Sequence, residues 1–222
     1  MATSASPNPS RSPDNDPQSW VPSKAGFHGY CIWVRPNETC ECQAHCKQVM
    51  EAFSKRFPPL LLPTWQPHIC LVAGITDEDA ALSAAKKLAA ETNVFHVTLC
   101  GAEVDGENED ERATIYFSWQ RLRAAWIAAS AGPTMDANGN DSLGISCMRA
   151  RELMGEKTQT VKFSPHLSLV YFDKGELDAA QRSTLKCELE SAFSHGTTFT
   201  VDAIHVAKTD GTPKDYKLLA SF

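Results

Sequence analysis

Two copies of one short segment carry the residues that could do chemistry. The segment reads Pro67-His68-Ile69-Cys70-Leu71-Val72 in one place and Pro165-His166-Leu167-Ser168-Leu169-Val170 in the other. The copies are 98 residues apart, and four of their six positions are identical. Imidazole is the only side chain whose unperturbed pKa lies near neutrality, so the two histidines can supply a base and an acid. The repeat therefore predicts paired acid and base chemistry.

The spacing within each copy predicts a strand. Residues i and i+2 of a strand point to the same face, so His68 and Cys70 project together, as do His166 and Ser168. The isoleucine and leucines between them then face the core. A thiol and a hydroxyl on the same faces as the two imidazoles could bind a tetrahedral anion between them.

The elements around the first copy follow from hydrophobic period and breakers. The pattern predicts a strand at 28–34, a helix at 42–57, a strand at 68–73 and a helix up to 91 with Thr76 as its N-cap. Strands at 94–104 and 113–119 are expected to pair across an acidic turn at 105–112. A helix at 120–130 and a polar loop at 132–144, a candidate lid, complete this part.

The second copy has the same surroundings. A strand at 166–172, a helix at 177–193 and strands at 199–207 and 216–221 are predicted, the last strand being a charged edge. A duplicated unit of this length is too long for a solenoid repeat. We therefore expect an α+β fold of two pseudo-symmetric lobes, with two mainly antiparallel sheets facing a central cleft and helices outside. Residues 1–25 are expected to be a disordered polar tail, and residues 26–222 one bilobal domain.

The composition narrows the partners. The chain has 222 residues and a formal charge of −6, from 27 acidic residues against 21 lysines and arginines. A protein that grips long nucleic acid needs a basic face, so we expect a small anionic ligand and no long nucleic acid. No apolar run approaches the ~18 residues of a membrane helix, so no membrane partner is expected.

The cysteines and the N-terminal segment indicate the compartment. Eight cysteines are too dilute for a disulfide scaffold, so we expect free thiols and a cytoplasmic protein. We also expect it to be a monomer. The first 25 residues lack the hydrophobic core of a secretory signal. A transit peptide is the alternative, against which Asp14 and Asp16 argue.

Two other groups of residues compete with the histidine pair. The segment 96–99, His-Val-Thr-Leu, matches the motif but lacks the proline and the following helix, so His96 is predicted to be structural. The segment 40–46, Cys-Glu-Cys-Gln-Ala-His-Cys, has ligand types that suit zinc. Cys42 and Cys46 already lie on the apolar stripe of the first helix, which favours core thiols and no metal.

The paired motifs resemble those of the 2H phosphoesterases. Residues 165–171, with Trp33 and the triplet Lys208-Thr209-Asp210, resemble the plant and fungal cyclic phosphodiesterases, and the resemblance spans about residues 27 to 222. It implies a bilobal catalytic domain that hydrolyses small cyclic phosphates without a metal ion or a cofactor. The resemblance also implies a place in the tRNA splicing pathway. The implied reactions convert ADP-ribose 1″,2″-cyclic phosphate to the 1″-phosphate and nucleoside 2′,3′-cyclic phosphates to 2′-phosphates.

The resemblance also implies roles for the site residues. His68 and His166 would be the acid and the base, while Cys70, Ser168 and Tyr171 would bind the phosphate. Trp33 could stack on an adenine or fill the core. The sequence departs from the family at Cys70, where the pattern has Thr or Ser, and a weaker donor there costs ~1 kcal/mol. Two alternatives stay open: a non-catalytic nucleotide or RNA-end binding module on the same fold, and an RNA-end-processing 2H enzyme.

Overall fold

The computed structural model describes residues 29–56, 66–104, 122–132, 140–155, 163–173, 177–210 and 215–222. The expected tail at 1–25, the turn at 105–112 and the strand at 113–119 lie outside these ranges, as does 133–139 of the expected loop. Within them, no helix has both the length and the apolar character needed to cross a membrane.

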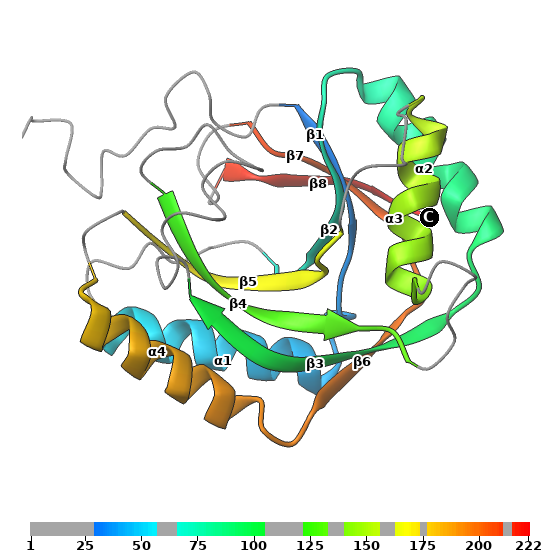
Figure 1. Ribbon diagram of the computed structural model, residues 1–222. Helices are drawn as coiled ribbons and strands as arrows, with labels where there is room; N and C mark the ends of the chain where they lie inside the picture. The colour runs from blue at the N-terminus through cyan, green and yellow to red at the C-terminus, as the bar shows by residue number, and fades with distance from the viewer. Residues whose placement is uncertain are drawn as a thin grey trace, which may run out of the picture.

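The strands form one antiparallel sheet. Across the described residues it has eight strands in the spatial order β6-β3-β4-β5-β2-β1-β7-β8. Their bounds are Tyr30–Val34 (β1), Ile69–Ile75 (β2), Phe95–Val104 (β3), Leu122–Ser130 (β4), His166–Asp173 (β5), Thr197–Val201 (β6), His205–Lys208 (β7) and Lys217–Ser221 (β8). The sheet is strongly curled, with β1, β7 and β8 at the top of Figure 1 and β3 and β4 at the bottom.

A single residue pair joins the two middle strands of this sheet. β2 and β5 pair only through Ile69 and Leu167, whereas β5 pairs with β4 along most of its length. We call this pair the seam. It divides the sheet into a first half-sheet, β2-β1-β7-β8, and a second half-sheet, β5-β4-β3-β6. The two expected lobes correspond to these half-sheets, which the seam joins into one sheet.

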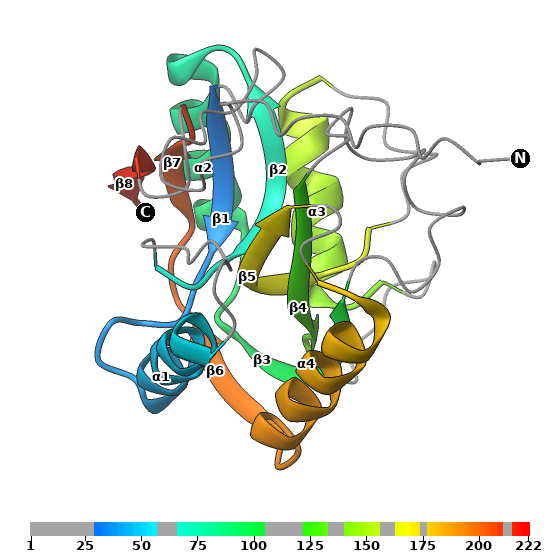
Figure 2. The ribbon, with the colours of Figure 1, turned by 90° about the vertical axis from the view of Figure 1, so that its left-hand side faces the viewer.

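Four helices cover the outer face of the curl in the described part of the chain. They span Glu41–Arg56 (α1), Glu78–Glu91 (α2), Ser142–Leu153 (α3) and Ala179–Ala192 (α4). α2 and α3 pack on the first half-sheet, and α1 and α4 pack on the second (Figures 1 and 2). Because these helices lie on the outer face, they do not cover the concave face of the sheet.

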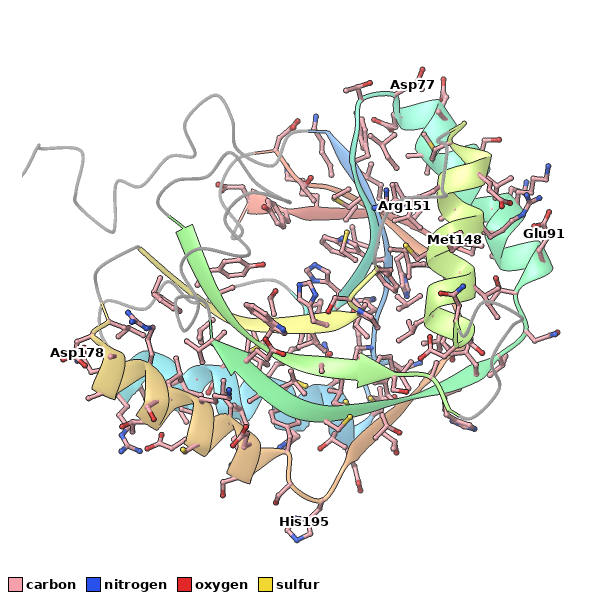
Figure 3. The ribbon with its side chains drawn as sticks, in the orientation of Figure 1. Asp77, Glu91, Met148, Arg151, Asp178 and His195 are labelled. Atoms are coloured by element: carbon pink, nitrogen blue, oxygen red, sulfur yellow. The ribbon has the colours of Figure 1, made fainter. Side chains whose placement is uncertain are left out.

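Aspartates begin three of these helices. Asp77, Asp141 and Asp178 each accept a hydrogen bond from the backbone N–H three residues later, and the first and last are labelled in Figure 3. A carboxylate at this position also interacts favourably with the helix dipole. The N-cap of α2 is thus Asp77, one residue after the expected Thr76.

The strand pairs do not belong to the lobes that their order along the chain predicts. Each motif keeps the helix that follows it, but the strand pairs are exchanged: β3 and β4 join the second half-sheet, and β7 and β8 join the first. The expected strand at 199–207 is two strands, β6 and β7, on different half-sheets. A local hydrophobic pattern predicts a strand but not which neighbour it pairs with, so the exchange was missed.

β4 corrects a second expectation, because a helix was predicted at 120–130. Ala125, Ile127 and Ala129 are buried, and the residues between them face the other way, which is the period of a strand. Alanine favours helices, but pairing with β3 on one side and β5 on the other outweighs that preference. The expected loop at 132–144 also ends earlier, because α3, which was not predicted, begins at Ser142.

The main core lies between the sheet and the helices. It contains the apolar residues of both motifs, Ile69, Leu71, Leu167 and Leu169, all at most 1% exposed. The predicted alternation is therefore confirmed. A smaller cluster of Cys31, Trp33 and Ala207, with Cys70 and Tyr216 against it, lies apart from this core, on the concave face.

Candidate active site

The two histidines meet at the seam. His68 and His166 each immediately precede the residue that forms the seam pair, Ile69 and Leu167. The alternation that buries those two residues turns both imidazoles to the concave face. Burial chiefly, and to a smaller extent the charge of His166, lower the pKa of His68. The structure thus brings together the two sites that the sequence placed 98 residues apart.

The same backbone bond orients both rings. His68 Nδ1 lies 3.0 Å from the carbonyl oxygen of Gln66, and His166 Nδ1 lies 2.8 Å from that of Ser164. A carbonyl oxygen only accepts, so Nδ1 carries the proton in each ring. In the neutral imidazole Nε2 is then the basic nitrogen. Gln66 is itself held by a side-chain hydrogen bond from Gln43 of α1.

The surroundings of the two rings differ. His68 is half-buried, and burial lowers the pKa of its imidazole to about 4, against the upward effect of the Gln66 carbonyl. His166 is exposed. At neutral pH His68 is therefore neutral, with its lone pair on Nε2, while solvent reaches His166 for proton exchange.

A tryptophan flanks each motif on the neighbouring strand. Trp33 of β1 is the cross-strand partner of Cys70, and its ring stacks on His68 with centroids 3.7 Å apart. Trp126 of β4 is the partner of Ser168, and its ring is tilted against His166 at 5.4 Å. Trp126 was missed because it was placed in a helix. Its alternation with Ala125 and Ile127 was the signal that could have found it.

The two anion donors occupy equivalent places. Ser168 is buried, and Cys70 is half-buried beside Cys31. A hydrogen bond between the two thiols, and then burial, raise the pKa of Cys70. Cys70 is therefore a neutral thiol at neutral pH and does not repel a phosphate.

Two tyrosines approach from opposite half-sheets. Burial, and then the nearby Tyr171 of β5, raise the pKa of the Tyr216 phenol. Tyr216 lies 6.4 Å from Trp33 between ring centroids. Tyr216, just before β8, was not predicted as a site residue, since only the exchange of strands brings it here.

The triplet Lys208-Thr209-Asp210 holds the start of β1. Thr209 N–H donates to the carbonyl of Gly29 at 2.8 Å, and Gly29 N–H donates to Asp210 at 2.8 Å. Gly29 has a φ of 92°, and a Cβ there would clash with the carbonyl of Ile75. The triplet thus fixes the strand that carries Trp33 and has no direct place among the site residues.

The competing groups lie elsewhere. His96 is exposed on β3, where its Nδ1 lies 3.1 Å from Thr200 Oγ1. Cys42 and Cys46 are buried in the core. His45 Nε2 bonds the carbonyl of Ala192. The described residues contain no group of three or more His, Cys, Asp or Glu side chains that could hold a metal ion.

Solved structures of other proteins resemble this arrangement. TT0787 of Thermus thermophilus has a TM-score of 0.54 at 16% identity, covering 87% of this chain and 96% of its own. The chain shares its fold. E. coli LigT with 3′-AMP (TM-score 0.47, 13% identity, 89% and 97% covered) and Kluyveromyces marxianus Usb1 (0.44, 10%, 86% and 96%) are also similar. No family model matches the chain, and no curated protein does. The α+β fold of two joined halves expected from the motifs is confirmed, and TT0787 shares it.

Proposed function

We propose that the chain hydrolyses cyclic phosphodiesters with its two histidines and without a metal ion. One observation carries this proposal: His68 and His166 stand on either side of the seam, each with Nδ1 bonded to the carbonyl two residues earlier. Two imidazoles with matched orientation can take a proton on one side of a phosphorus atom and give one on the other. The resemblance of the motifs to those of the 2H phosphoesterases supports the same conclusion.

His68 is the base in this mechanism. Its low pKa keeps it neutral at pH 7, so Nε2 accepts a proton from a water molecule as the water oxygen attacks phosphorus. Trp33, stacked on the ring, and the Gln66 carbonyl limit its movement. Orientation of this kind lowers the entropy cost of reaching the transition state.

His166 is the acid. In its protonated form it gives its proton to the ribose oxygen as the bond from phosphorus to that oxygen breaks. Ser168, Cys70 and Tyr171 donate hydrogen bonds to the remaining phosphate oxygens, where negative charge develops. Each turnover moves one proton from water to His68 and one from His166 to the product, and exchange with solvent restores both rings.

The substrates are small. The motifs resemble those of the cyclic phosphodiesterases, so we expect ADP-ribose 1″,2″-cyclic phosphate and nucleoside 2′,3′-cyclic phosphates to be hydrolysed to the 1″- and 2′-phosphates. A net charge of −6 opposes the binding of long RNA but not of one cyclic diester. A cytoplasmic monomer in a pathway such as tRNA splicing would fit these products.

A product-resolved assay tests the proposal. Purified protein is incubated in EDTA with a panel of cyclic phosphates, and the phosphate isomers are separated. Turnover with a single isomer, lost in both His68→Ala and His166→Ala, is the expected result. Wild-type rates in both variants would contradict the mechanism, and binding without turnover would identify a binding module instead.

A further inference from the structure

One arginine sits beside the site on the first half-sheet only. Trp33 pairs with Cys70 and Val34 with Ile69, so Arg35 is next in register, opposite His68. On the second half-sheet the matching place, the cross-strand partner of His166, is Ala128. The two half-sheets are built on the same plan around their motifs, and at this position they differ by one positive charge.

The Arg35 side chain is largely enclosed and has donor capacity left. It is only 10% exposed, and Nη2 donates to Glu38 at 3.1 Å. Its Nε is buried, and none of the described residues accepts a bond from it. A buried cationic donor without an acceptor costs free energy that a bound anion would recover. The Glu38 carboxylate meanwhile holds the guanidinium in place.

The charge of Arg35 acts on two histidines of the first half-sheet. After burial, which is the main cause, this charge helps to lower the pKa of His68, opposite which Arg35 lies in register, and of His205. His205 of β7 is the cross-strand partner of Trp33 and bonds Ser221 through Nδ1 at 2.8 Å. On the second half-sheet the partner of Trp126 is Glu103, which repels anions. An anion beyond the central phosphate would therefore be held on the first half-sheet.

We propose that Arg35 forms a subsite for a second phosphate, the one on the 5-carbon of the ribose that bears the cyclic phosphate. The inference rests on the proposed function: of its two expected substrate classes, ADP-ribose cyclic phosphate carries a diphosphate at that carbon, whereas a nucleoside 2′,3′-cyclic phosphate carries a phosphate there only when it is also 5′-phosphorylated. The guanidinium binds phosphate oxygens through two parallel N–H donors. Arg35 thus selects phosphorylated substrates over cyclic phosphates with a free 5-hydroxyl.

Binding of product analogues tests the subsite without requiring turnover. Calorimetry compares adenosine 2′-phosphate with adenosine 2′,5′-bisphosphate, and ribose 1-phosphate with ADP-ribose 1″-phosphate as the diphosphate arm. We expect the wild type to bind the bisphosphate about 10- to 100-fold more tightly than the monophosphate, as one charge-assisted pair allows. Arg35→Gln should abolish this ratio, which is the readout of the subsite, while Arg35→Lys keeps part of it.

Two further variants separate binding from structure. Glu38→Gln removes the anchor but keeps the guanidinium, so most of the ratio should remain. Arg149→Gln removes a surface arginine paired with Glu91 and should not change it. Equal affinity of the wild type for the two adenosine compounds, or a ratio that survives in Arg35→Gln, overturns the subsite. If the wild type did not turn over cyclic phosphates at all, that result would count against the proposed function. It is a different result from failure of the subsite, which the ratio of affinities measures.

Discussion

The two half-sheets share a plan and differ in what fills it. In each, a histidine bonds the carbonyl two residues earlier, a small donor follows, and a tryptophan faces that donor from the next strand. The first half-sheet encloses His68 between Trp33 and buried neighbours. The second leaves His166 exposed. One backbone arrangement can therefore present a base or an acid, depending on how far the ring is desolvated.

The largest expected effect tests whether both halves are needed. His68→Ala and His166→Ala should each lower kcat/KM on a cyclic phosphate by about 10²- to 10⁴-fold, since each removes one proton transfer. Steady-state kinetics in EDTA measure this. His96→Ala is the matched control, because His96 is exposed on β3 outside the site. If only one of the two variants lost activity, only one half-sheet would be needed for catalysis.

The tryptophans should differ in their effect on stability. Trp33 is 4% exposed, whereas Trp126 is half-buried. Trp33→Ala should lower the free energy of unfolding by about 3–5 kcal/mol, and Trp126→Ala by less, because less apolar area and a smaller cavity are involved. Urea denaturation at pH 7 gives both values. An equal loss would mean that the second half-sheet packs its tryptophan as closely as the first.

The buried histidines of the first half-sheet should make stability depend on pH. Burial, and then Arg35, lower the pKa of His205 to about 4, from 6.5 in the unfolded chain. The unfolded state therefore binds more protons between these values, so stability falls as pH drops from 6.5 to 4. For His205, which is 7% exposed, the loss is about 3 kcal/mol at most.

Replacement of His205 isolates this contribution. His205→Gln should flatten the decline in thermal midpoint between pH 6.5 and pH 4, relative to the wild type. His96→Gln, at an exposed position, should leave the decline unchanged. A wild-type slope in His205→Gln would show that the acid sensitivity arises elsewhere, and the two halves would then be alike in this respect.

The smallest effect concerns the two donors. Cys70→Thr restores a hydroxyl and should not lower kcat/KM, whereas Ser168→Cys should lower it several-fold, since the weaker donor costs about 1 kcal/mol. Initial rates on one cyclic phosphate compare the pair. A large loss in Cys70→Thr would assign the thiol a role of its own, through its bond to Cys31.

The two central histidines could be predicted from the sequence because each copy of the motif is a short, continuous segment. A short strand with alternating apolar residues is recognisable on its own, and its duplication predicts two lobes. The apolar stripe of α1 and the acidic start of α2 are likewise local features, and both helices have the predicted place.

The rest depends on contacts that no local pattern contains. Whether β3 and β4 join the first or the second motif is decided by packing across the whole domain. Trp126 was hidden in an alanine-rich segment whose helix propensity pairing overrides. Arg35 and Tyr216 reach the site only because strands far apart in the chain lie on one concave face.

The seam has a mechanical consequence. Bending a sheet about a single residue pair moves its outer strands furthest and the residues beside the pair least. His68 and His166 each stand one residue from that pair, so their separation is nearly unaffected when β6 and β8 swing apart. The spacing of the two imidazoles is therefore the part of the concave face least sensitive to any displacement of the outer strands.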